Sequence, residues 1–258
     1  MLFLLKINNE VDAILGDDCL FDHADGPYNE HNDLSNSSAD LRDNLEDAGD
    51  NSGRPIMIEF GLDGRVEEAE LKFNAHHLLP ADASVNKATE LLKIMNSQDN
   101  GGDLKGDIGY GVNHENNGMF LPTEDAWDVA RFGTWKGLQK IQDGYRLAYA
   151  YAYWAMRHTG RQFHTSHGDY SLWVLSRLEE IKMKMLQAKR ECKENKCKKT
   201  KPWKPPYNLV GKLDAIAEHI SSYLREPSYR WLAPLVTSPE SELYKFGMTP
   251  EEFGVEDR

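Results

Sequence analysis

The chain has 258 residues, of which 40% are hydrophobic, and its six Trp and eleven Tyr are sufficient for a packed core. Its three cysteines form no CxxC pair, which argues against a disulfide scaffold and against a thiolate zinc site. The net charge of −12 is uneven, because residues 1–70 hold 4 Lys/Arg and 18 Asp/Glu whereas the remainder holds 26 and 24. The excess negative charge lies in residues 1–70, so it does not exclude a nucleic-acid partner for residues 71–258.

The N-terminal part is predicted to be an acidic, flexible segment over residues 1–54. Residues 17–53 are rich in Asp, Asn, Ser and Gly and hold few large apolar side chains, so no stable core of their own is expected. The segment is a linker, or else a nucleic-acid mimic or a segment that binds a secretion adaptor or chaperone and restrains the basic part before delivery. The apolar run Met1–Leu5 is broken at Lys6 and does not predict a signal peptide, and no run is long enough to predict a membrane partner.

Two short strands are predicted over residues 56–77, at the start of a domain assigned to residues 55–205. The second strand ends at His76 and His77. Neighbouring residues on a strand point to opposite faces, so this pair is poorly placed to share one metal ion. It is well placed for two jobs, one histidine as a metal ligand and the other as a base. The alternative is a surface pair or a hydrogen-bonded packing pair.

The spacing of apolar residues predicts further helices, and a C-terminal helical extension is assigned to residues 206–258. The predicted helices cover residues 84–96, with Ser84 as the N-cap, and residues 135–156, 169–193 and 209–224. Residues 98–111 are predicted to be a loop. The apolar stripe of the second helix is interpreted as core (Tyr145, Ala148, Tyr149, Ala152, Tyr153 and Met156), as is that of the third (Leu172, Leu175, Leu178, Ile181, Met185 and Leu186).

Two further blocks of the chain carry metal-binding residue types. The first runs from Asn113 to Pro122 and contains Asn117, and the second contains His164 and His167. Histidine and asparagine are neutral donors to a divalent cation, and a strand, a turn and a helix can bring three such elements together. The three blocks together therefore favour a metal site over isolated polar residues.

These blocks resemble the AHH nucleases of the HNH/endonuclease VII superfamily, which are mostly bacterial toxin domains. The resemblance rests on Ala75-His76-His77 with the trailing Leu79-Pro80, on the run 117–122 (Asn-Gly-Met-Phe-Leu-Pro), and on His167 followed by Tyr170 and a long helix. It covers about residues 60–180. It implies an α+β fold in which a ββα-metal core (His-Me finger, HNH-like), elaborated with several α-helices, holds one divalent cation against a scissile phosphate.

The resemblance also implies roles for individual residues. His76 is the expected first metal ligand and His77 the expected general base, largely neutral at cytoplasmic pH. Asn117 either orients that base or helps to hold the metal. His167 is the expected distal ligand, and His164 is a further ligand or a phosphate contact, although either histidine can align with the family's ligand. The cation is Mg²⁺, Mn²⁺, Ni²⁺ or Zn²⁺.

A basic stretch follows the last block. Residues 182–204 carry ten Lys/Arg and two Glu, and they form either a solvated helix end or a contact surface for phosphates. The candidate nucleic-acid-binding residues are Lys182, Lys184, Lys189 and Arg190.

The function implied is a metal-dependent endonuclease that cleaves DNA with little sequence specificity, deployed as an antibacterial toxin and blocked by an immunity protein. Such a toxin is made in the bacterial cytoplasm and acts in the cytoplasm of a target cell, delivered by a secretion system that needs no signal peptide. The alternatives are an RNase on the same fold, and a non-catalytic nucleic-acid-binding or adaptor module with a structural metal site.

Overall fold

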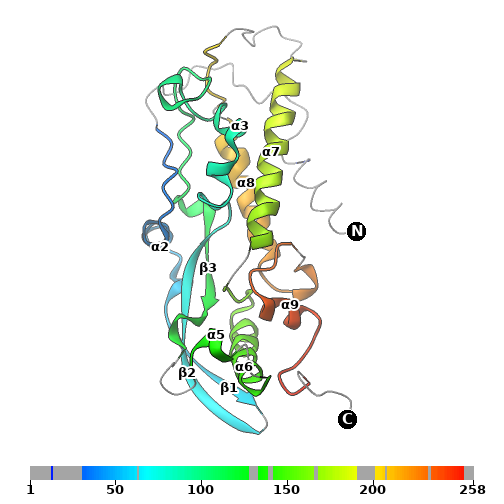
Figure 1. Ribbon diagram of the computed structural model, residues 1–258. Helices are drawn as coiled ribbons and strands as arrows, with labels where there is room; N and C mark the ends of the chain where they lie inside the picture. The colour runs from blue at the N-terminus through cyan, green and yellow to red at the C-terminus, as the bar shows by residue number, and fades with distance from the viewer. Residues whose placement is uncertain are drawn as a thin grey trace. The chain divides into compact units, whose positions relative to one another are not determined.

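The computed structural model describes the chain in two compact units. The described residues are 13, 31–62, 64–127, 133–138, 142–165, 168–190, 201–206, 208–231 and 234–252. Those of the first unit lie within Met1–Asn44, His77–Gly118 and Ser171–Ile220, and those of the second within Leu45–His76, Met119–Tyr170 and Ser221–Arg258. Helices and a small antiparallel sheet occur together (Figure 1), which confirms the α+β class.

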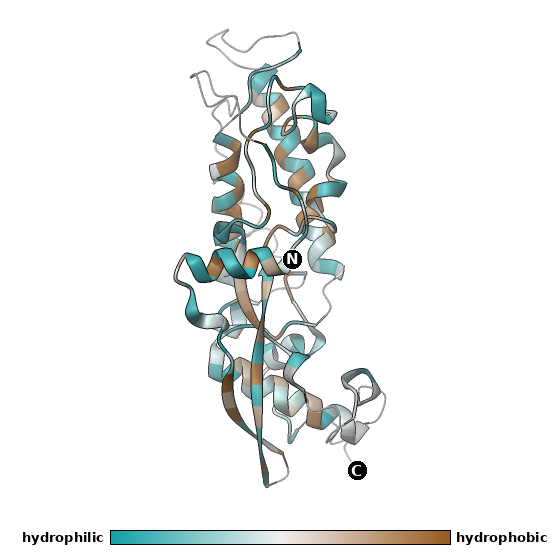
Figure 2. Ribbon diagram, turned by 90° about the vertical axis from the view of Figure 1, so that its left-hand side faces the viewer, coloured by the Kyte–Doolittle hydropathy of each residue, from teal (hydrophilic) through white to brown (hydrophobic). Residues whose placement is uncertain are grey.

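The sheet has three strands, in the order β1-β2-β3 (Figure 1). β1 (Ile56–Leu62) pairs antiparallel with β2 (Arg65–His77), and β3 (Gly118–Thr123) lies on the other side of β2. The ribbon of β2 alternates between hydrophilic and hydrophobic colours in Figure 2, as expected for a strand with one buried face. The prediction of two strands, the second ending at His76 and His77, is confirmed.

The core of the second unit is aromatic. α6 (Gln142–Thr159) packs against β1, and the Tyr151 hydroxyl donates to the Glu70 carbonyl at 3.1 Å. Phe60, Trp127, Trp135, Tyr151 and Phe163 have ring centroids 5.2–6.4 Å apart in successive pairs. This cluster fixes α6 on the sheet that carries His76.

The single helix predicted over residues 135–156 is described as two, α5 (Trp135–Leu138) and α6, with residues 139–141 outside the described part of the chain. The interpretation of its apolar stripe as core is confirmed, because Ala148, Tyr149, Ala152 and Met156 are buried. Tyr145 and Tyr153 are partly exposed.

The prediction of one helix over residues 84–96 is wrong. The segment forms a 3-10 turn (Val85–Lys87) and a short helix α3 (Thr89–Leu92), separated by Ala88 in a non-helical conformation. The predicted N-cap Ser84 makes no capping bond, since its hydroxyl donates to the Ser171 carbonyl at 2.7 Å. A tertiary contact therefore replaces the local one, although Val85, Ala88, Leu91 and Met95 are still buried and Leu92 is partly exposed.

Two long helices contribute to the first unit, α7 (Gly168–Arg190) and α8 (Asn208–Tyr223), both close to their predicted bounds. On α7 the predicted buried stripe is wrong at Leu172, which is 63% exposed, because Trp173 and Val174 turn inward at that level instead. Leu178, Ile181 and Met185 are buried as predicted. No helix of the described residues has both the length and the apolar character to cross a bilayer. The last helix, α9 (Pro239–Lys245), belongs to the second unit.

Residues 31–44 of the acidic N-terminal segment lie in the first unit and are hydrogen-bonded within it. The Asn32 amide donates to the Met95 carbonyl at 2.9 Å and accepts from the Tyr110 backbone N–H at 2.8 Å. Asp33 exchanges backbone hydrogen bonds with Tyr110 and Val112. Helix α2 (Ser38–Asp47) follows and buries Leu41 and Leu45. The conformation of residues 31–47 depends on long-range polar pairing as well as on the two leucines, and composition does not reveal such pairing. Residues 1–12 and 14–30 lie outside the described residues. The predicted domain boundaries stay predictions.

Candidate active site

His77 lies in the first unit at the end of β2 and is only 7% exposed. Its Nε2 is 2.9 Å from Oδ1 of Asn113. Burial lowers the pKa of His77 below its usual 6.5, while the hydrogen bond to Asn113 and the charge of Asp82 act in the opposite direction. The imidazole is therefore held mainly neutral at pH 7, which is the state of a proton acceptor.

The orientation of Asn113 fixes the tautomer of His77. The Asn113 Nδ2 donates to the Ser35 carbonyl at 2.9 Å, and the Ser35 hydroxyl and an Asp33 carboxylate oxygen each lie 3.3 Å from it. Its Oδ1 also accepts from the Ser37 backbone N–H at 3.2 Å. Because the amide nitrogen faces three acceptors, the amide oxygen faces the imidazole, and Nε2 of His77 carries the proton. Nδ1 is left with the lone pair.

The Asp33 carboxylate, which lies beside the amide nitrogen of Asn113, keeps its negative charge at neutral pH. The Ser35 hydroxyl bonds to the Asp33 carboxylate and lowers the pKa of Asp33, against the effect of burial. Asp33 is therefore an ionised acceptor at neutral pH. A carboxylate beside the amide nitrogen strengthens the Asn113 contact and favours positive charge on the imidazole.

Asn117 is fully buried and holds the backbone that follows His77. Its Oδ1 accepts from the Leu79 N–H at 2.7 Å, and its Nδ2 donates to the carbonyls of Leu79 and Val112 at 3.0 and 2.8 Å. Its own carbonyl accepts from the Leu78 N–H. The structure thus places Asn117 on the loop after His77 and places Asn113 on the His77 imidazole itself. Asn113 lies in the same block as Asn117 (residues 113–122), and nothing in the local sequence shows which of the two asparagines contacts His77.

His76 lies in the second unit and is 3% exposed. Its ring centroid is 5.0 Å from that of His164 and 5.2 Å from that of Tyr170. His164 is positioned by its backbone, since its N–H donates to the Pro122 carbonyl at 2.8 Å and it bridges Thr123 of β3. Burial raises the pKa of Tyr170, which keeps its phenol neutral. Two predicted ligands therefore meet from distant parts of the chain, while His167 is outside the described residues.

Comparison with models of known families gives one match. The family model AHH, described as a nuclease family of the HNH/ENDO VII superfamily with conserved AHH, matches residues 60–218, more than half of the chain. The chain belongs to this family. Its Ala75-His76-His77 lies within the match. Comparison with curated proteins and with solved structures gives no match. The AHH assignment makes the protein a nuclease, a hydrolase that acts on nucleic acids.

Nucleases of this superfamily are generally dependent on a divalent metal, and the two imidazoles of the AHH nuclease fit one. Imidazole nitrogens bind zinc at about 2.0–2.1 Å, which puts the centres of two rings that share one tetrahedral ion about 5 Å apart. The rings of His76 and His164 have this separation. Within the described ranges no three His, Cys, Asp or Glu side chains group to hold a metal ion.

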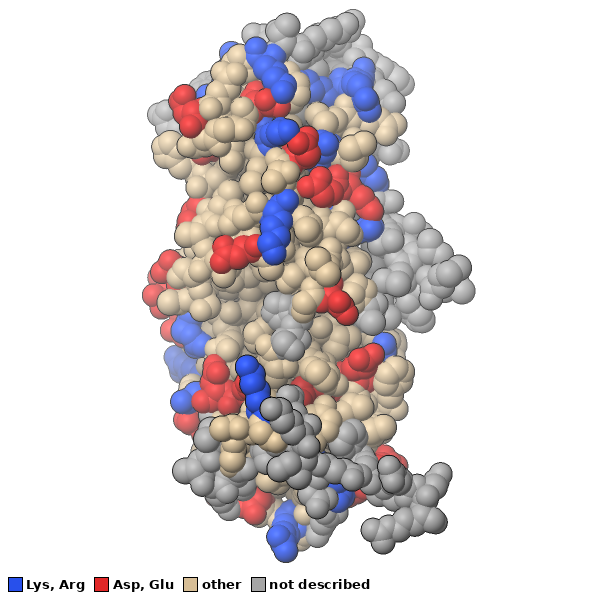
Figure 3. Space-filling model, in the orientation of Figure 1, with Lys and Arg blue, Asp and Glu red and all other residues tan. Residues whose placement is uncertain are grey.

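The predicted phosphate-binding lysines of the AHH nuclease contact other groups of the first unit. The Lys182 ammonium is 3.5 Å from a Glu90 carboxylate oxygen, and the Lys189 ammonium lies 3.1 Å from the centre of the Trp203 ring. Lys184 is partly exposed and Arg190 is exposed. On the face drawn in Figure 3, basic and acidic side chains alternate among the described residues. The nucleic-acid role of these four residues stays a prediction.

Proposed function

We propose that this AHH nuclease is a metal-dependent endonuclease that hydrolyses the phosphodiester bonds of DNA with little sequence specificity, and that His77 is its general base. The contact between Nε2 of His77 and Oδ1 of Asn113 carries the proposal. A neutral imidazole whose Nε2 proton is already donated has only Nδ1 available to accept a proton from water.

The proposed cation ligands are His76 and His164, together with His167, which the sequence predicts as the distal ligand. When bound, a divalent cation polarises the phosphate and stabilises the departing 3′ oxygen, an effect of several kcal/mol. His76 and His77 are joined by one peptide bond, so the proposed ligand and the proposed base are consecutive residues. We assign the two strands of the family's ββα-metal core to β2 and β3, because β2 carries His76 and β3 bridges His164 through Thr123.

The protein's own part in the proposed reaction is a proton transfer. Nδ1 of His77 takes a proton from the attacking water, the water oxygen bonds to phosphorus, and the bond to the 3′ oxygen breaks. The imidazole becomes positively charged in this step. Asn113 keeps its oxygen on the Nε2 proton, and the Asp33 carboxylate on the far side of that amide stabilises the new charge.

Cleavage of plasmid DNA tests the proposal. The wild-type protein is incubated with Mg²⁺, Mn²⁺, Ni²⁺ or Zn²⁺, with and without EDTA, beside His77→Ala. His158→Ala is the matched control, because His158 is an exposed histidine on α6 whose ring lies beside Trp154. Metal-dependent cleavage that His77→Ala removes and His158→Ala keeps supports the proposal. Equal cleavage by His77→Ala rejects His77 as the base, and binding without cleavage favours a non-catalytic module.

The same assay on RNA separates a DNase from an RNase on this fold. Deployment as an antibacterial toxin, delivered to the cytoplasm of a target cell and blocked by an immunity protein, is a further part of the proposal and is supported by the family resemblance alone. Expression in a bacterial cytoplasm tests it. Toxicity that His77→Ala removes supports a toxin, whereas harmless expression of an enzyme active in vitro contradicts it.

A further inference from the structure

The second unit holds two arginines directly opposite each other on facing backbone segments. Arg161 and Arg225 form an isolated antiparallel bridge. The flanking hydrogen bonds run from the Gln162 N–H to the Leu224 carbonyl at 3.0 Å and from the Glu226 N–H to the Gly160 carbonyl at 2.7 Å. Side chains opposite each other in such a pair are neighbours on one face, and like charges at these positions are destabilising. A bound anion would offset the repulsion between the two positive charges.

The guanidinium of Arg161 is fixed by neutral acceptors. Its Nη1 donates to the Ser52 hydroxyl and to the Phe120 carbonyl, both at 2.8 Å. Burial is the main cause that lowers the pKa of Arg161, and the charge of Arg225 adds to it while Asp50 opposes it. The two guanidinium groups are thus close enough to repel each other. Within the described residues neither of them forms an ion pair.

Two neighbouring carboxylates, those of Glu226 and Asp50, hydrogen-bond to other groups. A Glu226 oxygen accepts from the Ser228 backbone N–H at 2.6 Å, and Glu226 also bonds the Tyr244 side chain. The Asp50 carboxylate accepts from the Ser52 N–H at 2.9 Å. Among the described residues neither carboxylate forms an ion pair with either arginine, and the planar N–H donors of the two guanidinium groups match the bidentate geometry of a phosphate group.

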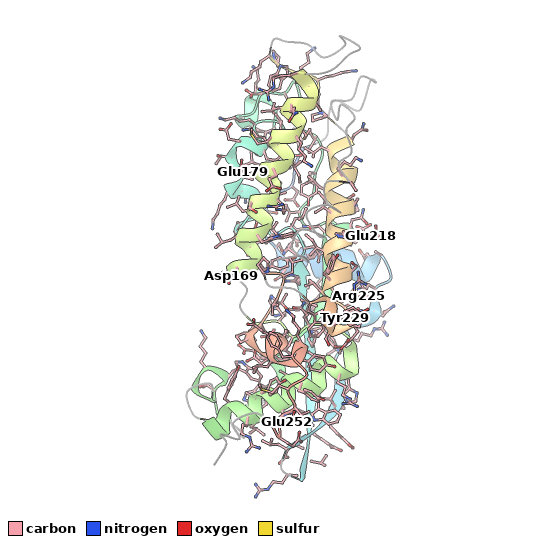
Figure 4. The ribbon with its side chains drawn as sticks, turned by 90° about the vertical axis from the view of Figure 1, so that its right-hand side faces the viewer. Asp169, Glu179, Glu218, Arg225, Tyr229 and Glu252 are labelled. Carbon is pink, nitrogen blue, oxygen red and sulfur yellow. The ribbon has the colours of Figure 1, made fainter. Side chains whose placement is uncertain are left out.

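An exposed aromatic ring follows the pair. Tyr229 is 70% exposed, and Figure 4 labels Arg225 and Tyr229 on the segment after α8. Arginines for backbone phosphates together with an aromatic ring for a base are the combination found in nucleic-acid-binding surfaces, whereas inorganic phosphate needs no ring. Arg161 also stands three residues before His164, on a segment bonded to β3 at both residues.

We propose that Arg161 and Arg225 bind a backbone phosphate of the nucleic-acid substrate and that Tyr229 stacks on an adjacent base. This assignment rests on the proposed function, because the substrate is taken to be a nucleic acid. It extends the contact surface to a part of the chain that follows the family match, since Arg225 and Tyr229 lie beyond residue 218.

The test measures binding without cleavage. The full-length His77→Ala protein in EDTA is titrated with labelled DNA, double-stranded and single-stranded, over a range of salt concentrations. Arg225→Gln in that background weakens binding roughly fivefold to tenfold at 0.1 M salt and reduces the salt slope by about 1. Tyr229→Ala weakens binding and leaves the slope unchanged. The matched control is Arg65→Gln, an exposed arginine at the start of β2, which leaves both quantities unchanged.

An affinity and slope that Arg225→Gln does not alter would overturn the proposal, and so would a weaker affinity with an unaltered slope, since that is an indirect effect. An unaltered affinity in Tyr229→Ala would contradict the proposed stacking of Tyr229 on a base. The result is independent of catalysis, because a protein that binds DNA through Arg225 but does not cut it supports this proposal and contradicts the nuclease mechanism. A protein that cuts DNA and binds it without Arg225 does the reverse.

Discussion

The two adjacent histidines of the AHH sequence lie in different surroundings. His77 in the first unit is held by a chain of directional hydrogen bonds through Asn113 to Ser35 and Asp33. His76 in the second unit packs against the rings of His164 and Tyr170. Polar pairing fixes a tautomer, whereas ring packing fixes the position of a ring. The comparison supports the division into a base and a metal ligand.

The largest expected effect separates these two roles. His77→Ala lowers kcat by about 10²–10⁴-fold and leaves the affinity for the divalent cation unchanged, because it removes only the proton acceptor. His76→Ala lowers the affinity for the cation as well as the rate. Isothermal titration with Mn²⁺, beside single-turnover cleavage, measures both. Equal loss of cation affinity in the two variants contradicts the division.

The next effect concerns stability. Asn117→Ala leaves the Leu79 N–H and the carbonyls of Leu79 and Val112 buried without their partners. The free energy of unfolding falls by roughly 2–4 kcal/mol, since each orphaned group bears its desolvation cost. Denaturant titration measures the change. A loss of rate without a loss of stability would place Asn117 in the chemistry instead of the loop.

Asn113→Leu, a variant of similar size, tests the polar side of the comparison. Without the amide oxygen, His77 can take either tautomer and a less defined orientation, so kcat falls about 10²-fold while KM changes little. Steady-state kinetics measures the two constants. A rise in KM alone contradicts a role in positioning the base.

The arrangement of the strands could be predicted from local sequence, but the polar network could not. Two short strand-forming runs about a turn are a short-range signal, and this signal correctly placed His76 and His77 at the end of a strand. The contact between Asn113 and Ser35 joins residues 78 positions apart and leaves no periodic trace. Ser84 failed as an N-cap for a similar reason, because its partner Ser171 is 87 positions away. Tertiary hydrogen bonds therefore limit what a single sequence reveals about this site.

A smaller effect concerns pH. The pKa of His77 is lowered in the folded protein, so the imidazole remains a proton acceptor below pH 6.5. The acid limb of kcat/KM accordingly lies below pH 6.5. The unfolded chain binds this proton more readily than the folded chain does, so the contribution of His77 to stability is present above pH 6.5 and is lost at lower pH, as the pH falls through the depressed pKa of the folded protein. A pH–rate profile in buffers of constant ionic strength shows the limb, and a midpoint above 6.5 contradicts the burial argument.

The tautomer of His77 is the most direct test of the central claim, that Asn113 reserves Nδ1 as the proton acceptor. Nitrogen-15 NMR of protein labelled at histidine distinguishes the two ring nitrogens, and His77→Ala identifies the resonances. The account predicts a proton on Nε2 and a lone pair on Nδ1 at neutral pH, with that preference lost in Asn113→Leu. A proton on Nδ1 in the wild-type protein would contradict it.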